Sequence, residues 1–308
     1  MGSIIILHRK CGWRYGIEIS LALGGGGSRG YAHIGVIRRL GQLGFEVRAV
    51  AGSSVGGLAA ALMAAGYSAD KLETLFSGLD QSKFFGLAPR DAPALLGLTG
   101  AARMLSDLLG ERTFEDLDYP CAVTATDIQS GREVVLKQGR VLDAVLATTA
   151  LPGVFPPKLY VGYQLVDGGV LDPVPVSVAR SLAPTLPVVA VILSSLVDTG
   201  PNLPRLPLPL QVPTPIVERL TRLRIAQAIG IFLQAVDVGG CMLAELRLQA
   251  DHPELIIRPE VGRIGLLDNV DVHQIVHVGE LAADTALPEL KRAFTWQRRL
   301  RRRYFPRW

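Results

Sequence analysis

The stretch that decides the fold runs from Leu21 to Gly56 and reads LALGGGGSRGYAHIGVIRRLGQLGFEVRAVAGSSVG. A largely apolar run over 17–23, ended by glycines, and a second over 45–51 both predict buried strands. Apolar residues recur at helical spacing over 31–43, and 55–65 is rich in Ala and Leu, so a helix is expected after each strand. Alternating strands and helices with tight connections are typical of a parallel sheet covered by helices. The fold class is therefore predicted as α/β, with a mainly parallel central sheet and helices on both faces.

The rest of the chain continues this alternation. Further helices are expected over 70–79, 89–109, 141–147, 174–182, 216–249 and 271–294, and further strands over 121–126, 133–136, 163–166, 188–193 and 255–257. The segment 89–109 is the least regular, because Pro93, Gly97 and Gly100 interrupt it. Two interpretations of this segment stay open: ordinary packing against the core, or a lid over the functional site.

The composition indicates a large core and excludes several classes of protein. Of 308 residues, 49% are hydrophobic and 19% are charged, which excludes global disorder. The net charge of +4 is modest, and because much of the basic excess lies at the C-terminal end, nucleic acid is not expected as a partner. The three cysteines, Cys11, Cys121 and Cys241, show no metal-ligand spacing and no disulfide framework. We therefore expect no metal site, no disulfide bonds and a reducing compartment.

The sequence divides into five parts. Residues 1–16 form an N-terminal extension, 17–198 the domain that carries the motifs described below, 199–215 a proline-rich connector, 216–295 a helical region packing on the core, and 296–308 a basic, aromatic tail. At the N-terminus a short apolar run precedes the basic residues, which is the reverse of a signal peptide, and no apolar run reaches about 18 residues. A cytoplasmic protein is expected.

The tail reads WQRRLRRRYFPRW and combines arginines with Trp296, Tyr304, Phe305 and Trp308. Arginines mixed with interfacial aromatic residues suit peripheral contact with an anionic membrane surface, in this case the inner face of the cell membrane. The same pattern describes a solvated basic tail. Both interpretations stay open.

The residues Gly52-Ser53-Ser54-Val55-Gly56 match the pattern Gly-x-Ser-x-Gly between an expected strand and an expected helix. Flanking glycines permit a sharp turn that lifts the Ser54 hydroxyl out of the sheet, and the helix that follows directs its N-terminus at developing negative charge. Ser53 is excluded as the nucleophile, because moving the frame by one residue loses both glycines. The alternative is a packed, glycine-rich turn with a solvated serine.

Gly25, Gly27 and Gly30 form a GxGxxG pattern, which taken alone is a weak dinucleotide-binding fingerprint. A Rossmann fold needs an acidic residue at the end of the second strand, and this chain has Ala51-Gly52-Ser53-Ser54 there. The Gly-Lys-Ser/Thr of a phosphate-binding P-loop is also missing. What remains is a run of free backbone N–H groups at a helix start, which beside a nucleophilic serine favours an oxyanion hole.

A serine nucleophile needs a base. The five histidines, His8, His33, His252, His273 and His277, lie in contexts that do not mark a catalytic position. Asp167 closes a short expected strand and is followed by Gly168 and Gly169, so other backbone can approach it closely. Burial would raise its pKa from the ordinary value of about 3.9 and make it a better base. The alternatives are a Ser-His-Asp triad and an inert Asp-Gly hairpin turn.

Together these motifs resemble the patatin-like phospholipase family, in a bacterial form. The resemblance rests on four segments in the family's order: residues 25–30, 52–56, 167–169 and the segment ATTALPGVFPP at 147–157. It covers roughly 17–193 and implies a three-layer sandwich, lipid acyl-ester hydrolysis, no cofactor and no metal. It also implies a Ser54-Asp167 dyad, an oxyanion hole from Gly25, Gly26, Gly27 and Val55, and supporting roles for Arg29, Gly30, Gly52, Gly56, Gly168 and Gly169.

The chain departs from the family's usual Asn-Pro at Asp172-Pro173, which affects local loop hydrogen bonding. Arg29 either braces the glycine loop or meets a phosphate headgroup. The expected partner is a lipid or phospholipid, and the sequence predicts no oligomeric state. Phospholipase A or lysophospholipase, neutral-lipid lipase and general carboxylesterase all fit as activities. A non-enzymatic module that binds lipid or nucleotide through the glycine loop is the alternative from another class.

Overall fold

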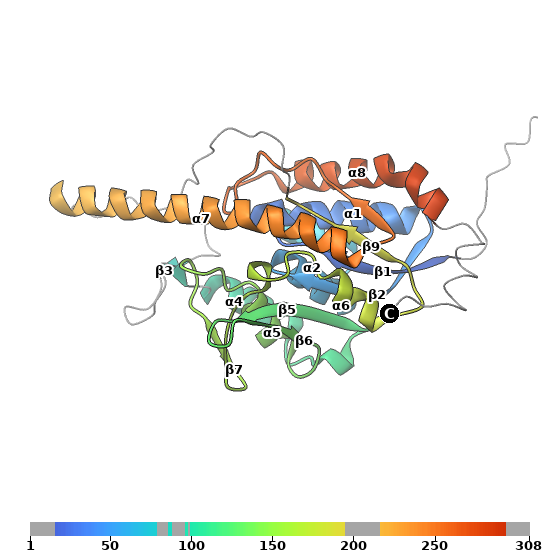
Figure 1. Cartoon of the computed structure of the whole chain (residues 1–308), viewed down its shortest axis with the longest axis horizontal. Helices are drawn as coiled ribbons and strands as arrows, with labels where there is room; N and C mark the ends of the chain where they lie inside the picture. The colour runs from blue at the N-terminus through green and yellow to red at the C-terminus, as the bar shows by residue number, and fades with distance from the viewer. Residues whose placement is uncertain (1–15, 79–85, 88–95, 98, 195–215, 294–308) are drawn as a thin grey trace, which may run out of the picture.

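A computed structural model describes residues 16–78, 86–87, 96–97, 99–194 and 216–293. Within these ranges an eight-stranded sheet has the order β10-β9-β1-β2-β5-β8-β7, with β6 also paired to β5 (Figure 1). The strands are β1 (Ile17–Leu23), β2 (Phe45–Ser53), β5 (Cys121–Asp127), β6 (Arg132–Leu136), β7 (Lys158–Tyr160), β8 (Tyr163–Asp167), β9 (Val188–Val191) and β10 (Leu255–Ile257).

The sheet changes from parallel to antiparallel pairing at β5. From β10 to β5 every neighbouring pair is parallel, whereas β6 and β8 both run antiparallel to β5, and β7 runs antiparallel to β8. The parallel strands β1 and β9 are buried on both faces: every residue of β1 except Glu18 is buried, and so are all four residues of β9. The predicted α/β class with a mainly parallel sheet is confirmed.

Helices cover both faces of the sheet, as predicted (Figure 1). They are α1 (Tyr31–Gln42), α2 (Val55–Ala64), α3 (Ala69–Ser77), α4 (Thr99–Leu109), α5 (Val141–Thr148), α6 (Val176–Leu182), α7 (Ile216–Asp251) and α8 (Val272–Ala293). One core lies between the sheet and α1, α2, α3, α4, α5 and α8, and a smaller core lies between the opposite face and α6 with the C-terminal part of α7. The result is a three-layer sandwich.

Side-chain alternation along β1 explains the two cores. Leu21 and Leu23 belong to the larger core, whereas Ala22 belongs to the smaller one. The buried Ser20 faces α6 and donates a hydrogen bond of 2.8 Å to the Ala179 carbonyl. Small residues on this second face allow α6 to approach the strands closely.

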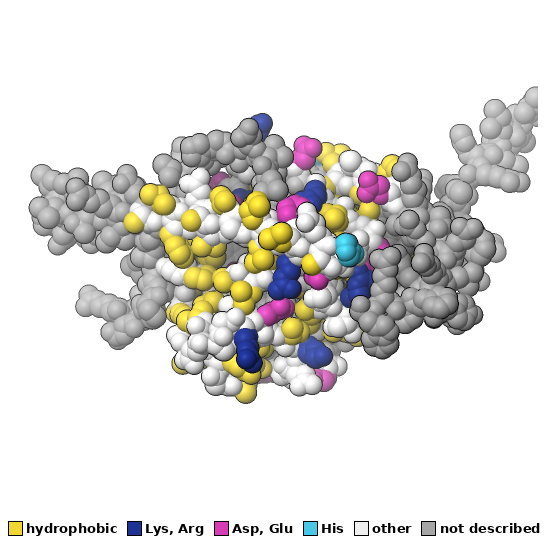
Figure 2. All heavy atoms as spheres, in the orientation of Figure 1, with side chains coloured by type: hydrophobic (Ala, Val, Ile, Leu, Met, Phe, Trp, Pro, Cys, Tyr) yellow, Lys and Arg dark blue, Asp and Glu magenta, His cyan; other side chains and the backbone are white. Residues whose placement is uncertain are grey.

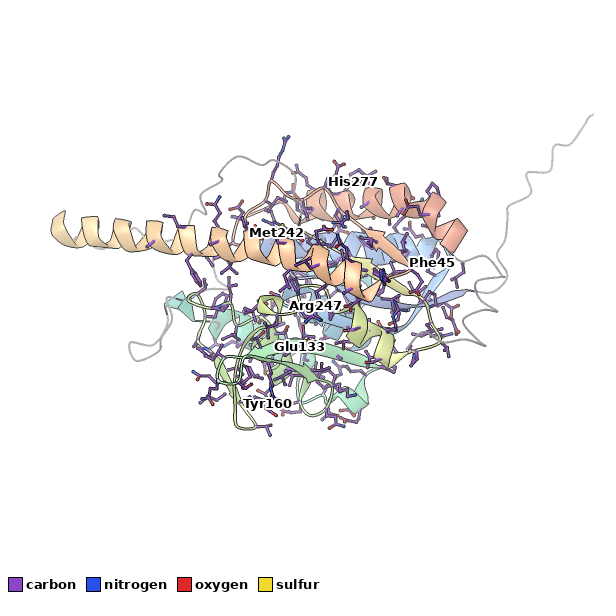
Figure 3. All side chains as sticks on the ribbon, in the orientation of Figure 1. Phe45, Glu133, Tyr160, Met242, Arg247 and His277 are labelled. Carbon is purple, nitrogen blue, oxygen red and sulfur yellow. The ribbon has the colours of Figure 1, made fainter. Side chains whose placement is uncertain are left out.

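Helix α7 crosses the molecule and extends beyond the sheet at one end (Figure 1). Arg247 on α7 lies 3.5 Å from the Glu133 carboxylate of β6 and donates to the Leu171 carbonyl, which attaches the C-terminal half of the helix (Figure 3). Val238 and Met242 are more than half exposed, and hydrophobic side chains are visible along this helix in Figure 2.

The expected helix over 89–109 is only partly correct. Leu96–Gly97 forms strand β4, which pairs antiparallel with β3 (Gly86–Leu87), and the helix begins at Thr99. Gly97 is a poor helix former, which is consistent with a strand at this position, and residues 89–95 and 98 of the expected helix lie outside the described residues. Two further differences are β7, which the sequence did not predict, and α6, which begins at Val176 and not at Val174 because Pro173 and Pro175 precede it.

Several predictions lie outside the described residues. These include residues 1–15 of the N-terminal extension, the whole of the proline-rich connector at 199–215 and the basic, aromatic tail at 296–308. Within the part of the chain that the structure describes, no helix combines the length and the apolar character needed to cross a bilayer.

Candidate active site

The pairing of β5 brings two distant strand ends together. Strand β6 occupies one side of β5 over 123–127, so β2 and β8 share the other side. Thr124 is the last β5 residue to pair with β2, at Ser53, and the next residue, Ala125, pairs with Asp167 at the end of β8. Because β2 runs parallel and β8 antiparallel to β5, their C-terminal ends meet end to end.

Ser54 lies in a strained turn between β2 and α2. Its φ of 54° and ψ of −127° are outside the regions that a residue with a side chain normally adopts. Glycine is needed on both sides of this turn, as the sequence predicts. A Cβ on Gly52 would collide with the Gly56 carbonyl, and a Cβ on Gly56 would collide with the Leu23 carbonyl. The Ser54 N–H is held by the Thr148 side chain, at 2.8 Å from Oγ1.

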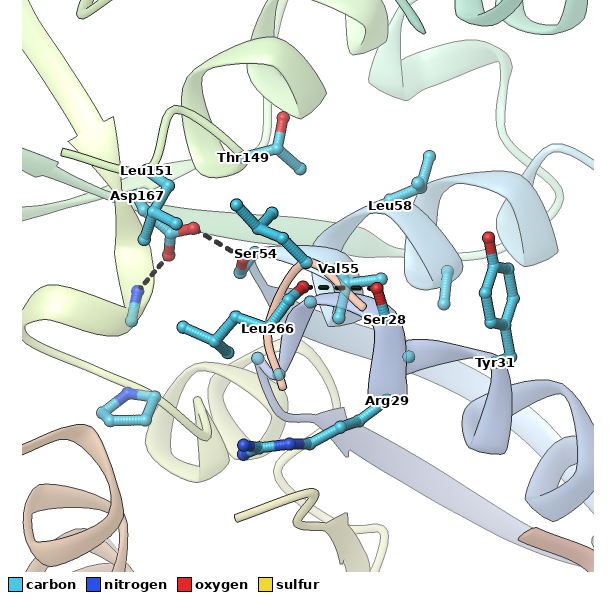
Figure 4. A pocket seen from close by; sticks show the side chains of 18 of the residues that line it. Ser28, Arg29, Tyr31, Ser54, Val55, Leu58, Thr149, Leu151, Asp167 and Leu266 are labelled. Atoms are coloured by element: carbon cyan, nitrogen blue, oxygen red, sulfur yellow. Dashed lines mark hydrogen bonds between the residues drawn. The ribbon is translucent and has the colours of Figure 1, made fainter. Parts of the chain in front are cut away.

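Ser54 and Asp167 are in direct contact. The Ser54 hydroxyl donates a hydrogen bond of 2.5 Å to Oδ2 of Asp167, across 113 residues of sequence (Figure 4). The Gly169 N–H donates to the other carboxylate oxygen at 2.8 Å, which fixes the orientation of the carboxyl group. Gly168 is buried against Thr124, where a Cβ would collide with the Thr124 carbonyl.

Burial sets the basicity of Asp167. The residue is 4% exposed, and this desolvation raises the pKa of its carboxyl to about 6, against the lowering effect of the hydrogen bonds from Ser54 and Gly169. A carboxylate with this pKa is deprotonated at neutral pH and still accepts a proton more readily than an ordinary aspartate.

The glycine loop lies directly against the serine. A Cβ on Gly25 would stand 3.2 Å from the Ser54 Cβ. The Gly25 N–H, however, donates to the Pro173 carbonyl at 3.0 Å, so this donor is already used, in contrast to the expectation from the sequence. Among the described residues, no acceptor is found for the N–H groups of Gly26, Gly27 and Val55. Within the described residues these three N–H groups are therefore unpaired.

Arg29 braces the loop. It is 4% exposed, its guanidinium binds both carboxylate oxygens of Asp237 on α7 at 3.0 and 2.6 Å, and its Nε donates to the Ile264 carbonyl at 2.6 Å. The adjacent Gly30 packs against Val55, where a side chain would collide with the valine methyl groups. With these contacts made, the geometry favours the bracing role of Arg29 over contact with a phosphate.

None of the four histidines that the structure describes lines the pocket around Ser54. His33 is buried and its Nε2 contacts the Gly24 carbonyl at 2.8 Å, and desolvation lowers its pKa to about 4. His273 and His277 lie on α8 beside Glu73 and Glu280. The described ranges also hold no cluster of side chains suited to a metal ion.

Ser54, Asp167 and the glycine loop all line one pocket of about 270 Å³ with mostly apolar walls (Figure 4). Sequence reasoning missed two residues of this site. Thr148 lies within the ATTALPG segment that carried part of the resemblance, although its contact with Ser54 was not anticipated. Asp237 had no local signal, because it is one acidic residue in a long helix and only the fold brings it to Arg29.

Several known proteins are similar in sequence to this chain. The profile of the family described as patatin-like phospholipase matches residues 21–180. An uncharacterized NTE family protein of Mycobacterium tuberculosis is 37% identical over 163 residues, which are 52% of this chain and 45% of that protein. Lysophospholipase NTE1 of Mycosarcoma maydis is 33% identical over 204 residues, 64% of this chain and 10% of that protein. The chain thus spans less than half the length of these two relatives.

A solved structure gives independent support for the fold. VipD from Legionella pneumophila superposes with a TM-score of 0.53 at 14% identity, over 90% of this chain and 67% of that chain. The likeness concerns the fold alone. Because the family profile covers more than half of the sequence, the chain belongs to the patatin-like phospholipase family.

Proposed function

We propose that this protein is a serine hydrolase that cleaves fatty-acyl ester bonds of lipids through a Ser54-Asp167 dyad. The observation that carries the proposal is the 2.5 Å hydrogen bond from the Ser54 hydroxyl to a buried carboxylate, at a strained turn that opens into an apolar pocket. A nucleophile in contact with a base of raised pKa is the arrangement that acyl transfer requires.

The first half-reaction forms an acyl-enzyme. Ser54 Oγ attacks the ester carbonyl carbon while Oδ2 of Asp167 takes the hydroxyl proton. The carbonyl oxygen becomes an oxyanion, for which Gly26, Gly27 and Val55 offer N–H donors. The C–O bond to the alcohol then breaks, and the departing oxygen receives the proton from Asp167. The acyl group remains bonded to Ser54.

The second half-reaction releases the fatty acid. Asp167 takes a proton from a water molecule, whose oxygen attacks the acyl-enzyme carbonyl and forms a second oxyanion at the same donors. Collapse of this intermediate breaks the bond to Ser54 Oγ, and the proton returns to the serine. Each cycle consumes one ester and one water and needs no cofactor.

The substrate class rests on the pocket and on the relatives. The apolar walls suit an acyl chain, and a relative from Mycosarcoma maydis bears the name lysophospholipase. We propose lipid or phospholipid esters as substrates. Peripheral membrane contact through 296–308 stays a prediction from the sequence, as does the location in the cell.

A lipid panel tests this proposal. Purified protein is incubated separately with phosphatidylcholine, lysophosphatidylcholine, triacylglycerol and a short p-nitrophenyl ester, and the products are measured by mass spectrometry. We expect free fatty acid from at least one lipid and none from Ser54→Ala. Release from the p-nitrophenyl ester alone would favour a general esterase, and no release from any ester would favour the non-enzymatic module.

A further inference from the structure

The pocket around Ser54 has two unlike sides. The side formed by the glycine loop and α7 includes Ser28, Arg29, Asp237 and the nearby Ser194, and it carries most of the polar groups. The side formed by α2, α3 and α4 is lined by aliphatic and aromatic side chains. In Figure 4 the apolar residue Leu58 lies beyond Val55 on the side away from Asp167.

Helix α2 forms one continuous wall of the apolar side. Val55, Leu58, Ala59 and Leu62 have the spacing i, i+3, i+4 and i+7, so they share one face of the helix. This face starts at Ser54 and extends over about two turns, roughly 10 Å along the axis. Leu62 at its far end is 1% exposed, so the wall leads from the nucleophile into the interior.

Helices α3 and α4 form the facing walls. Leu72 and Phe76 lie one turn apart on α3, and Phe76 contacts the ring of Tyr31 with 5.7 Å between centroids. On α4, Ala101, Met104 and Leu105 again have the spacing i, i+3 and i+4 and line the same pocket. No charged side chain of α2, α3 or α4 is among the described residues that line the pocket.

From this arrangement we infer that the space between α2 and α4 is the acyl-chain channel, and that Ala101 and Met104 set the length of chain it accepts. The inference rests on the proposed function. A headgroup or glycerol alcohol would lose its hydration without hydrogen-bonding partners in this apolar space, whereas an acyl chain gains from burial there. The alcohol side of the ester therefore faces the glycine loop and α7.

Ala101 and Met104 are suited to this role by size and flexibility. Alanine leaves room in the wall that a larger residue would fill, and methionine adapts its shape to irregular space. Their neighbour Ala102 is half-buried on the same turn of α4 and does not line the pocket, which makes it a matched control.

The primary test compares Ala101→Trp with Ala102→Trp. For each protein, kcat/KM is measured on p-nitrophenyl acetate, octanoate and palmitate. We expect Ala101→Trp to lower the ratio of palmitate to acetate hydrolysis by at least about tenfold, because the indole fills the channel. Ala102→Trp should keep the wild-type profile. Equal chain-length profiles for the two variants would overturn the inference.

Met104→Ala tests the channel in the opposite direction. Removing the side chain opens space, so the ratio of palmitate to octanoate hydrolysis should rise. An unchanged ratio would contradict the assignment of Met104. If Ala101→Trp loses all activity, this variant still decides the question.

A binding assay separates the channel from the chemistry. In the Ser54→Ala background, a fluorescent polyene fatty acid is titrated into the protein, with and without Ala101→Trp. We expect saturable binding that Ala101→Trp weakens by at least about tenfold and Ala102→Trp does not. If binding shows this dependence but the wild-type protein hydrolyses no ester, the proposed function is refuted and the channel stands. Binding that is insensitive to Ala101→Trp would refute the channel.

Discussion

Ser53 and Asp167 pair with consecutive residues of β5, Thr124 and Ala125, and this places the ends of β2 and β8 against each other. The dyad contact follows from this pairing, because Ser54 is the residue after Ser53. Two local motifs more than a hundred residues apart thus form one site through the register of a third strand.

The pH dependence of hydrolysis should report Asp167. Because the base must be deprotonated, kcat/KM is expected to rise with pH through about 6 and to level off above it. The measurement is a pH profile on a neutral ester, with Ser54→Ala as the blank. A rising limb centred near 4, the ordinary value for an aspartate, would contradict the effect of burial on the Asp167 pKa.

Thr148→Val should slow hydrolysis, because the Ser54 N–H loses its hydrogen bond to the Thr148 hydroxyl. The variant keeps the shape of the side chain but removes the acceptor for the Ser54 N–H, and an unpaired buried donor costs about 1–3 kcal/mol. We expect kcat to fall by about tenfold or more with little change in KM. Thr285→Val is the matched control, since Thr285 is an exposed residue of α8 whose hydroxyl donates to the Leu281 carbonyl in the same helix. Equal kinetics for both variants would remove Thr148 from the site.

Asp237→Asn should destabilise the glycine loop. It leaves the buried Arg29 guanidinium without its charged partner, which we expect to lower the free energy of unfolding by up to about 3 kcal/mol and to reduce kcat. Asp284→Asn breaks the exposed pair with Arg39 and should cost less than about 1 kcal/mol, without loss of activity. Chemical denaturation and ester kinetics measure both effects. If the two variants behave alike, Arg29 does not brace the loop.

Asp172→Asn should change how stability depends on pH. Asp172 is fully buried, and desolvation together with Glu133 raises the pKa of its carboxyl to about 7. The unfolded chain loses this proton near pH 4, whereas the folded protein loses it only near pH 7. Between about pH 4 and about pH 7 the free energy of unfolding therefore falls as the pH rises, by about 1.4 kcal/mol for each pH unit. Asparagine removes this dependence.

We therefore expect Asp172→Asn to gain stability relative to the wild type from pH 5 to pH 8, measured as the midpoint of chemical denaturation. Asp107→Asn, at an exposed position on α4, should show no such trend. A constant difference between Asp172→Asn and the wild type across this pH range would contradict the raised pKa of Asp172.

Much of the fold could be predicted because its signals are local. The apolar runs of β1 and β2, the helical spacing of α1 and the glycines that separate them are all contained in one stretch of sequence. The same holds for the turn at Ser54, since Gly52 and Gly56 are needed at fixed positions beside the serine. Such features depend on a few neighbouring residues and can be recognised without the fold.

The features of the site that could not be predicted depend on contacts between segments far apart in the sequence. The hydrogen bond from Gly25 to Pro173 removes one expected oxyanion donor, and the pairing of Arg29 with Asp237 requires α7 to lie against the loop. Short elements were also missed, because β7 has only three residues and β4 only two. A run of this length carries no periodicity to distinguish strand from loop.

The most direct test of the account is covalent labelling by a fluorophosphonate, followed by peptide mass spectrometry. We expect one label per wild-type protein, on Ser54, and none on Ser54→Ala. Labelling of Asp167→Asn should be slower by at least about a hundredfold, because the serine loses its base. Labelling that persists in Ser54→Ala, or that proceeds at the wild-type rate in Asp167→Asn, would contradict the dyad.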